Sequence, residues 1–69
     1  MIKTGKELRR YRKDYRLEPK HIIADFGKSQ AWYYAKETCD ELDFLHQLAF
    51  TKYFENVRER ELKRLGAMS

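Results

Sequence analysis

The chain has 69 residues, a net charge of +4 and one cysteine. A chain of this length forms one domain and buries only about 60% of its unfolded surface, so it needs a helical core, a partner subunit or both. Cys39 has no second cysteine to pair with, and the chain opens with no apolar leader, which suits a reducing cytoplasm. No apolar run approaches the roughly 18 residues of a membrane span. We therefore expect a single cytoplasmic domain over residues 1–69 that makes no contact with a membrane.

Charge is distributed unevenly along the sequence. Residues 1–20 carry eight Lys or Arg against three Asp or Glu, whereas residues 37–55 carry one Lys against five acidic residues. Such a split gives the molecule a basic face and an acidic face, and a basic face attracts polyanions. The alternative is a solvated helix surface of uneven composition.

Glycine and proline divide the first half of the chain into helical pieces, and no stretch alternates regularly enough to predict a strand. The first helix is expected from about Lys6 to Tyr15, with Thr4 as its N-cap and Glu7 completing a capping box. Its apolar stripe consists of Leu8, Tyr11 and Tyr15. The basic residues of this helix lie mainly off that stripe: Arg9, Arg10, Lys13 and Arg16.

Two short helices follow, separated by a glycine turn. Pro19 is suited to the first position of a helix, and Gly27 is expected to end that helix in a left-handed conformation. Its buried face is expected to be Ile22, Ile23 and Phe26. Ser29 is a good N-cap, so a further helix is expected from Gln30 to about Glu37.

Residues 41–65 have helical spacing and no breaker, which predicts one helix of about six turns or two shorter ones. We expect the domain core over about residues 4–57 and a charged extension over residues 58–69. Leu62 and Leu65 in this extension are a candidate dimer contact, and a frayed terminus is the alternative. The fold class is therefore all-α, a compact helix-turn-helix bundle of four to five helices with a long C-terminal helix.

The segment from Leu8 to Glu37 resembles the helix-turn-helix of the lambda-repressor-like and Cro-like family. The resemblance extends over roughly residues 6–54. The matching pieces are Leu8-Arg9-Arg10-Tyr11-Arg12-Lys13, Ile23-Ala24-Asp25-Phe26-Gly27, Ser29-Gln30-Ala31-Trp32-Tyr33-Tyr34, and Glu37. Ala24 lies three residues before Gly27, where the family has its small residue four before, and Lys28 replaces an apolar residue. This difference leaves the register of the recognition helix open by one residue.

The resemblance implies a small sequence-specific DNA-binding transcriptional regulator, similar to the repressors and excision or switch factors of phages and mobile elements. It would act on double-stranded DNA as a homodimer, with a recognition helix over about residues 29–37 in the major groove. Gln30 would bond an adenine edge, Ser29 would reach a phosphate, and Ala31 with Trp32 or Tyr33 would touch a thymine methyl or a sugar. The remaining contacts, to phosphates, would come from Lys28, Lys36, Arg9, Arg10, Arg12, Lys13 and Lys20.

The main alternative is a small helical module that binds and inhibits or adapts a larger protein. Its contact surface would consist of Trp32, Tyr33, Tyr34, Phe50, Tyr53 and Phe54. A helix-turn-helix fold that binds a protein is a third reading. In so small a chain at least one residue of the aromatic triplet belongs to the core, and we expect Tyr33 or Tyr34 to be buried and Trp32 to be the most exposed.

An enzyme is not expected. The sequence has no glycine loop for phosphate and is too short to build a shielded pocket. His21 and His46 lie far apart and Cys39 has no histidine near it, so neither a metal site nor a cysteine nucleophile is expected. We expect no cofactor.

Overall fold

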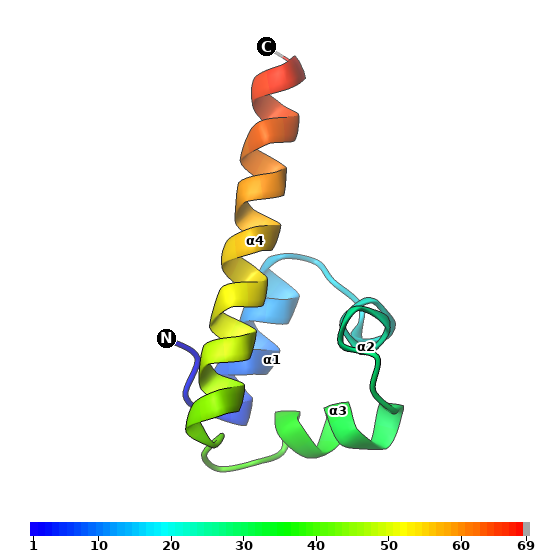
Figure 1. Ribbon diagram of the computed structural model, residues 1–69, viewed down its shortest axis with the longest axis vertical. Coiled ribbons are helices and arrows are strands. Elements are labelled where there is room, and N and C mark those ends of the chain that lie inside the picture. The colour runs from blue at the N-terminus through cyan, green and yellow to red at the C-terminus, as the bar shows by residue number, and fades with distance from the viewer. Residues whose placement is uncertain (69) are drawn as a thin grey trace.

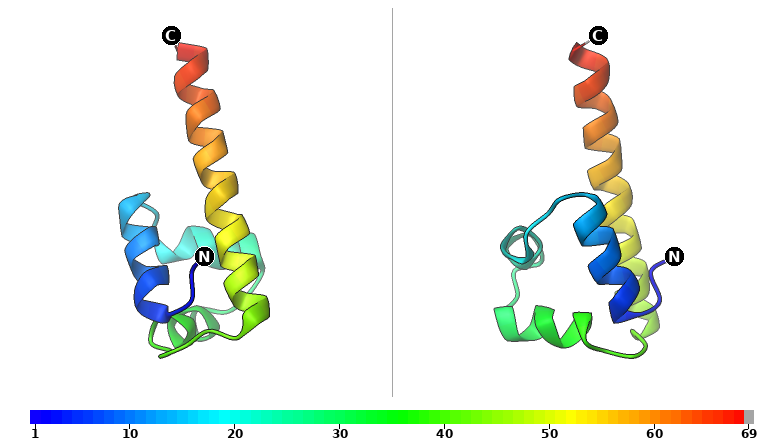
Figure 2. Two further views of the ribbon diagram at one scale, coloured as in Figure 1. Left: turned by 90° about the vertical axis from the view of Figure 1, so that its left-hand side faces the viewer. Right: turned by 180° about the vertical axis from the view of Figure 1, so that it is seen from behind.

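The computed structural model describes residues 1–68, with side chains as far as residue 66. The chain is all-α and consists of α1 (Gly5–Asp14), α2 (Pro19–Phe26), α3 (Gln30–Glu37) and α4 (Phe44–Met68). The first three helices gather around the first half of α4, and the second half of α4 extends past them (Figures 1 and 2). The predicted fold class is confirmed, and residues 44–68 form one helix rather than two.

Local chemistry places the ends of the first three helices. The hydroxyl of Thr4 accepts the N–H of Glu7 at 3.1 Å, and that of Ser29 accepts the N–H of Trp32 at 3.1 Å, so both predicted N-caps are confirmed. Gly27 ends α2 with φ of 64°, in the left-handed region where a side chain is strained. Arg16 also has a positive φ, 56°, and closes the end of α1 without a glycine.

The core lies between the three short helices and the inner face of α4. Two rings pack against this face: Tyr15, at the C-cap of α1, stacks on Phe54 with centroids 5.6 Å apart, and the ring centroid of Phe26 on α2 lies 5.0 Å from that of Phe50. The buried apolar residues are Ile2, Leu8, Ile22, Tyr33, Leu42, Phe50, Phe54 and Val57. The core thus begins at Ile2, two residues before the predicted start, and its last member is Val57.

Residues before α1 are fixed by hydrogen bonds to distant parts of the chain. The N–H of Ile2 donates to the hydroxyl of Thr51 at 2.9 Å, and the carbonyl of Lys3 accepts the N–H of Leu42 at 2.8 Å. The chain then enters α1 at Gly5, whose N–H donates to the carbonyl of Cys39 at 3.0 Å. A side chain at Gly5 would overlap the end of α3, since an added Cβ would collide with the carbonyl oxygens of Lys36 and Glu37.

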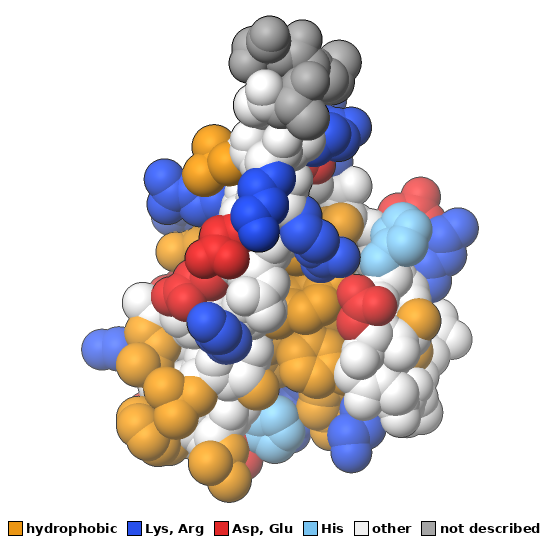
Figure 3. All heavy atoms as spheres, turned by 45° about the horizontal axis from the view of Figure 1, so that its top comes forward, with side chains coloured by type: hydrophobic (Ala, Val, Ile, Leu, Met, Phe, Trp, Pro, Cys, Tyr) orange, Lys and Arg blue, Asp and Glu red, His pale blue; other side chains and the backbone are white. Residues whose placement is uncertain are grey.

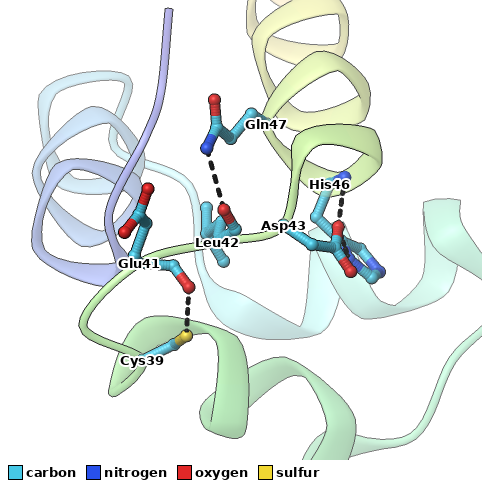
Figure 4. A network of polar contacts seen from close by, with 6 residues as sticks. All are labelled: Cys39, Glu41, Leu42, Asp43, His46 and Gln47. Atoms are coloured by element: carbon cyan, nitrogen blue, oxygen red, sulfur yellow. Dashed lines mark hydrogen bonds and ion pairs between the residues drawn. The ribbon is translucent and has the colours of Figure 1, made fainter.

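Polar contacts in the connection between α3 and α4 determine where α4 begins (Figure 4). The Asp43 carboxylate accepts the N–H of His46 at 2.9 Å and contacts its Nδ1 at 2.6 Å. The Gln47 amide donates to the Leu42 carbonyl at 2.8 Å. The His46 N–H, followed by the His46 side chain, lowers the pKa of Asp43. Asp43 is therefore the N-cap of α4.

Among the described residues, no helix is both long and apolar enough to cross a lipid bilayer.

Candidate nucleic-acid interface

An ion pair fixes α3 against α1. Arg12 Nε donates to Glu37 Oε2 at 2.7 Å, and a second guanidinium nitrogen of Arg12 donates to the Leu17 carbonyl at 3.2 Å. The two charged side chains are only 14% and 7% exposed. Burial alone would lower the pKa of Arg12, but its bond to the Glu37 carboxylate raises it. The expectation that Arg12 contacts phosphate is therefore wrong, because its guanidinium is largely buried and bonds to Glu37 and to the Leu17 carbonyl.

Tyr33 lies in the centre of the core and is fully buried. The expectation that it touches DNA is wrong, and the expectation that one tyrosine of the triplet is buried is confirmed. Its hydroxyl is buried and finds no hydrogen-bond partner within the described part of the chain. Burial first, and the nearby Glu37 carboxylate second, raise the pKa of Tyr33 far above its ordinary value.

Trp32 is half-buried between α2 and α4, so the expectation that it is the most exposed of the triplet is wrong. Its ring centroid lies 6.0 Å from those of Phe26 and Phe50. Two ammonium groups lie over the same ring, Lys28 at 5.8 Å and Lys36 at 5.6 Å from its centroid. Lys36 therefore stands on the flank of α3 that faces α4, whereas Lys28 reaches the ring from the turn between α2 and α3.

The outer face of α3 is set by the burial of Tyr33. Its exposed residues are Gln30, Ala31, Tyr34, Ala35 and Thr38, the last of these at the C-cap. Tyr34 is 43% exposed and lies one turn after Gln30, so it belongs to this surface, although the sequence analysis assigned it no DNA contact. Adjacent residues of a helix point about 100° apart. Burial of Tyr33 therefore turns its neighbour Tyr34 away from the core. Glu37 is the one acidic residue of α3, and it points inward to Arg12.

Cations stand at the N-terminal end of this face. Lys20, Lys28, Gln30 and Tyr34 share the lining of an open hollow of about 540 Å³ between α2 and α3. Lys20 is exposed and forms a surface ion pair with Glu18 at 3.2 Å, which solvent screens. The predicted residues Ser29, Gln30 and Ala31 are exposed beside this hollow.

A second group of cations stands at the other end of the face. Lys6 and Arg9 of α1 line an open hollow of about 500 Å³ together with Thr38, and Asp40 lies in the same hollow. Arg10 and Lys13 continue along the exposed side of α1. The sequence analysis predicted Arg9, Arg10 and Lys13 for this role and missed Lys6. We refer to the exposed residues of α3 with Lys6, Arg9, Lys20 and Lys28 as the α3 surface.

The histidines are held by local contacts. His46 contacts Asp43, and His21 Nδ1 accepts the N–H of Glu18 at 3.3 Å, which puts the proton of a neutral ring on Nε2. Within the described residues no three His, Cys, Asp or Glu side chains gather in a way that would hold a metal ion.

Comparison of the chain with protein-family models, with curated proteins and with solved structures found no match. The resemblance to Cro-like proteins therefore stays a prediction.

Proposed function

We propose that this protein is a small DNA-binding transcriptional regulator whose α3 surface enters the major groove. The observation that carries the proposal is the charge of this surface. The one carboxylate of α3 is neutralised inside the fold by Arg12, and Lys20, Lys28, Lys6 and Arg9 stand at the two ends of its outer face. The exposed residues of α3 include no acid, and at the two ends of the face the four cations outnumber the two neighbouring acids, Glu18 and Asp40. Such a face suits a groove that has phosphates along both edges.

The side chains of the face fit base recognition in kind and size. Ala31 and Ala35 are small and exposed, which allows the helix backbone to approach the floor of the groove. Gln30 presents an amide that bonds adenine N6 and N7 together, and Tyr34 presents a ring edge and a hydroxyl one turn further along. Ser29 stands at the N-terminus of α3, where backbone N–H groups favour a phosphate.

Binding to mixed-sequence duplex DNA over a salt series tests this proposal. Three or four phosphate contacts predict a slope of log K against log salt of roughly −3, because each contact contributes about −0.9. Lys20→Ala and Arg9→Ala should each reduce the steepness of that slope by about one. Lys63→Ala, which removes an exposed cation on the far part of α4, is the matched control and should leave the slope unchanged. Absence of binding even at low salt would overturn the proposal.

A second candidate is a protein-binding role for the same hollow between α2 and α3. Pro19, Ile23, Ala24 and Tyr34 give this hollow an apolar part that an apolar side chain of a protein partner would fill. The surface first expected for this role is not present, because Tyr33, Phe50 and Phe54 are buried and Trp32 and Tyr53 are half-buried. Salt dependence separates the two candidates, since apolar docking is far less sensitive to salt than phosphate contact.

A further inference from the structure

Residues 58–65, in the second half of α4, extend past the three short helices (Figure 1). Residues 58–66 are all exposed, including Leu62 at 58% and Leu65 at 56%. The chain exposes 5269 Å². A compact monomer of 8.4 kDa should expose only about 4,600 Å². The excess of about 650 Å² approaches the roughly 800 Å² that each partner buries in a standard interface.

The beginning of the same helix carries a second exposed apolar patch. Phe44 is 63% exposed, Leu45 76% and Leu48 42%. Hydrophobic side chains gather at this end of α4, at the lower left of Figure 3, while the upper part of the helix is mostly charged. Both ends of α4 thus leave leucines in solvent.

The residues between these two ends form an ordered pattern along one side of α4. Positions 48, 52, 55, 59 and 62 alternate in steps of four and three, which keeps them on one stripe of a helix. Read in order they are Leu48, Lys52, Glu55, Glu59 and Leu62: apolar, cationic, central glutamate, anionic, apolar. One leucine of the stripe lies seven residues before Glu55 and the other lies seven residues after it. The charged residue between Glu55 and each leucine is a lysine on the N-terminal side and a glutamate on the C-terminal side.

We propose that this stripe pairs with the same stripe of a second copy, with the two α4 helices antiparallel and Glu55 near the two-fold axis. This arrangement places Leu48 against the partner's Leu62 and Lys52 against the partner's Glu59. A parallel pair would instead place lysine against lysine and glutamate against glutamate at both charged positions. Charge complementarity therefore selects the antiparallel arrangement.

The two Glu55 side chains near the axis would repel each other without neighbouring cations. Arg58 lies one turn further along each helix and is exposed, so each Glu55 faces a guanidinium from the partner within reach of its side chain. Phe44 and Leu65 extend the same pairing outward, because they lie eleven residues before and ten residues after Glu55. The second copy thus covers both apolar ends of α4.

The pairing has a consequence for the α3 surface, and this step alone rests on the proposed function. In each protomer α3 lies at the beginning of α4 (Figure 1). A helix of 25 residues is about 37 Å long, so an antiparallel pair carries its two α3 helices near opposite ends of a rod of about that length. This distance is close to the one helical turn of DNA, about 34–36 Å, that separates half-sites.

Single cysteines on the stripe test the arrangement without DNA. In a Cys39→Ser background, Glu55→Cys should give disulfide-linked dimers under mild oxidation because the two copies of residue 55 lie near the axis. Leu48→Cys alone and Leu62→Cys alone should stay uncrosslinked, since copies of either residue lie about 20 Å apart. An equal mixture of these two variants should crosslink. Crosslinking of all three single variants would overturn the antiparallel arrangement.

Charge reversal tests the same contacts by the dimer dissociation constant, measured by sedimentation equilibrium. Lys52→Glu should weaken the dimer at least about tenfold because it turns two attractive pairs into repulsive ones. Adding Glu59→Lys to this variant should restore wild-type affinity. Lys13→Glu on α1 is the control and should have no effect. A wild-type protein that stays monomeric at the highest concentration reached would overturn the inference, and it would leave binding of a monomer to DNA intact.

Discussion

The guanidinium of Arg12 and the carboxylate of Glu37 meet at 2.7 Å, and this contact joins the end of α1 to the end of α3. The pair has two effects on the molecule. It holds α3 at a fixed angle to α1, and it removes the one acidic residue of α3 from the outer face of that helix. Stability and surface charge therefore depend on the same contact.

Replacement of Glu37 by Ala should cost about 3 kcal/mol of unfolding free energy, because it leaves the Arg12 charge largely buried without its partner. Urea unfolding followed by circular dichroism measures this loss. Glu61→Ala is the matched control, since it breaks the exposed Glu61–Arg64 pair of 2.8 Å and should cost less than about 1 kcal/mol. Equal losses in both variants would contradict a structural role for the Arg12–Glu37 pair.

Gly5→Ala should destabilise the fold by about 2 kcal/mol or more, because the added methyl group would collide with the Glu37 carbonyl oxygen and force α1 away from α3. Thermal and urea unfolding measure the change. Gly66→Ala provides the opposite case, since its added Cβ would meet no atom within 4 Å, and alanine favours a helix by up to about 1 kcal/mol. A Gly5→Ala protein as stable as the wild type would disprove the close contact between the two helices.

Asp43 should make the stability of the protein pH-dependent. Its pKa is lowered in the folded state from the ordinary 3.8, chiefly by the His46 N–H, so its ionised form stabilises the fold above about pH 4. This contribution is lost as the pH falls through the lowered pKa. Asp43→Asn should therefore be less stable than the wild type at pH 7, and the difference should shrink below pH 4. A difference that is constant with pH would show that the carboxylate charge has no part in capping α4.

Gln30→Ala should reduce the preference of the protein for its selected DNA site over mixed-sequence DNA by roughly 10-fold, because one bidentate contact to a base discriminates by about 1–3 kcal/mol. Competition binding at fixed salt measures both affinities. Lys20→Ala is the comparison, since a phosphate contact should weaken binding to both DNAs alike. Equal weakening of both DNAs by Gln30→Ala would exclude base recognition by this residue.

The parts of the fold that local chemistry decides were predictable from the sequence. Pro19, Gly27 and Ser29 gave the bounds of α2 and α3 because each acts on its own backbone or on a neighbour three residues away. Thr4 placed the start of α1 to within one residue for the same reason. A helical segment over residues 41–65 was predictable because these residues include no glycine or proline. The sequence did not decide whether this segment forms one helix or two.

Features that depend on distant parts of the chain were not predictable. Three consecutive aromatic residues on a helix of eight residues leave its buried side undecided until α1 and α4 are in place. The sequence therefore does not decide between Tyr33 and Tyr34 as the buried tyrosine, and it wrongly favours Trp32 as the exposed residue. Arg12 looked like its basic neighbours because only the fold brings it to Glu37, 25 residues away. The tight packing of Gly5 on α3 also gives no local signal.

Titration of isotope-labelled protein with mixed-sequence duplex DNA, followed by the amide signals in NMR spectra at low salt, tests the central claim most directly. The account predicts that the shifted signals belong to the α3 surface, with Gln30, Ala31 and Tyr34 at its centre and Arg9 at its edge, and that added salt reverses the shifts. An unchanged spectrum, or shifts confined to Phe44 and its neighbours at the start of α4, would contradict it.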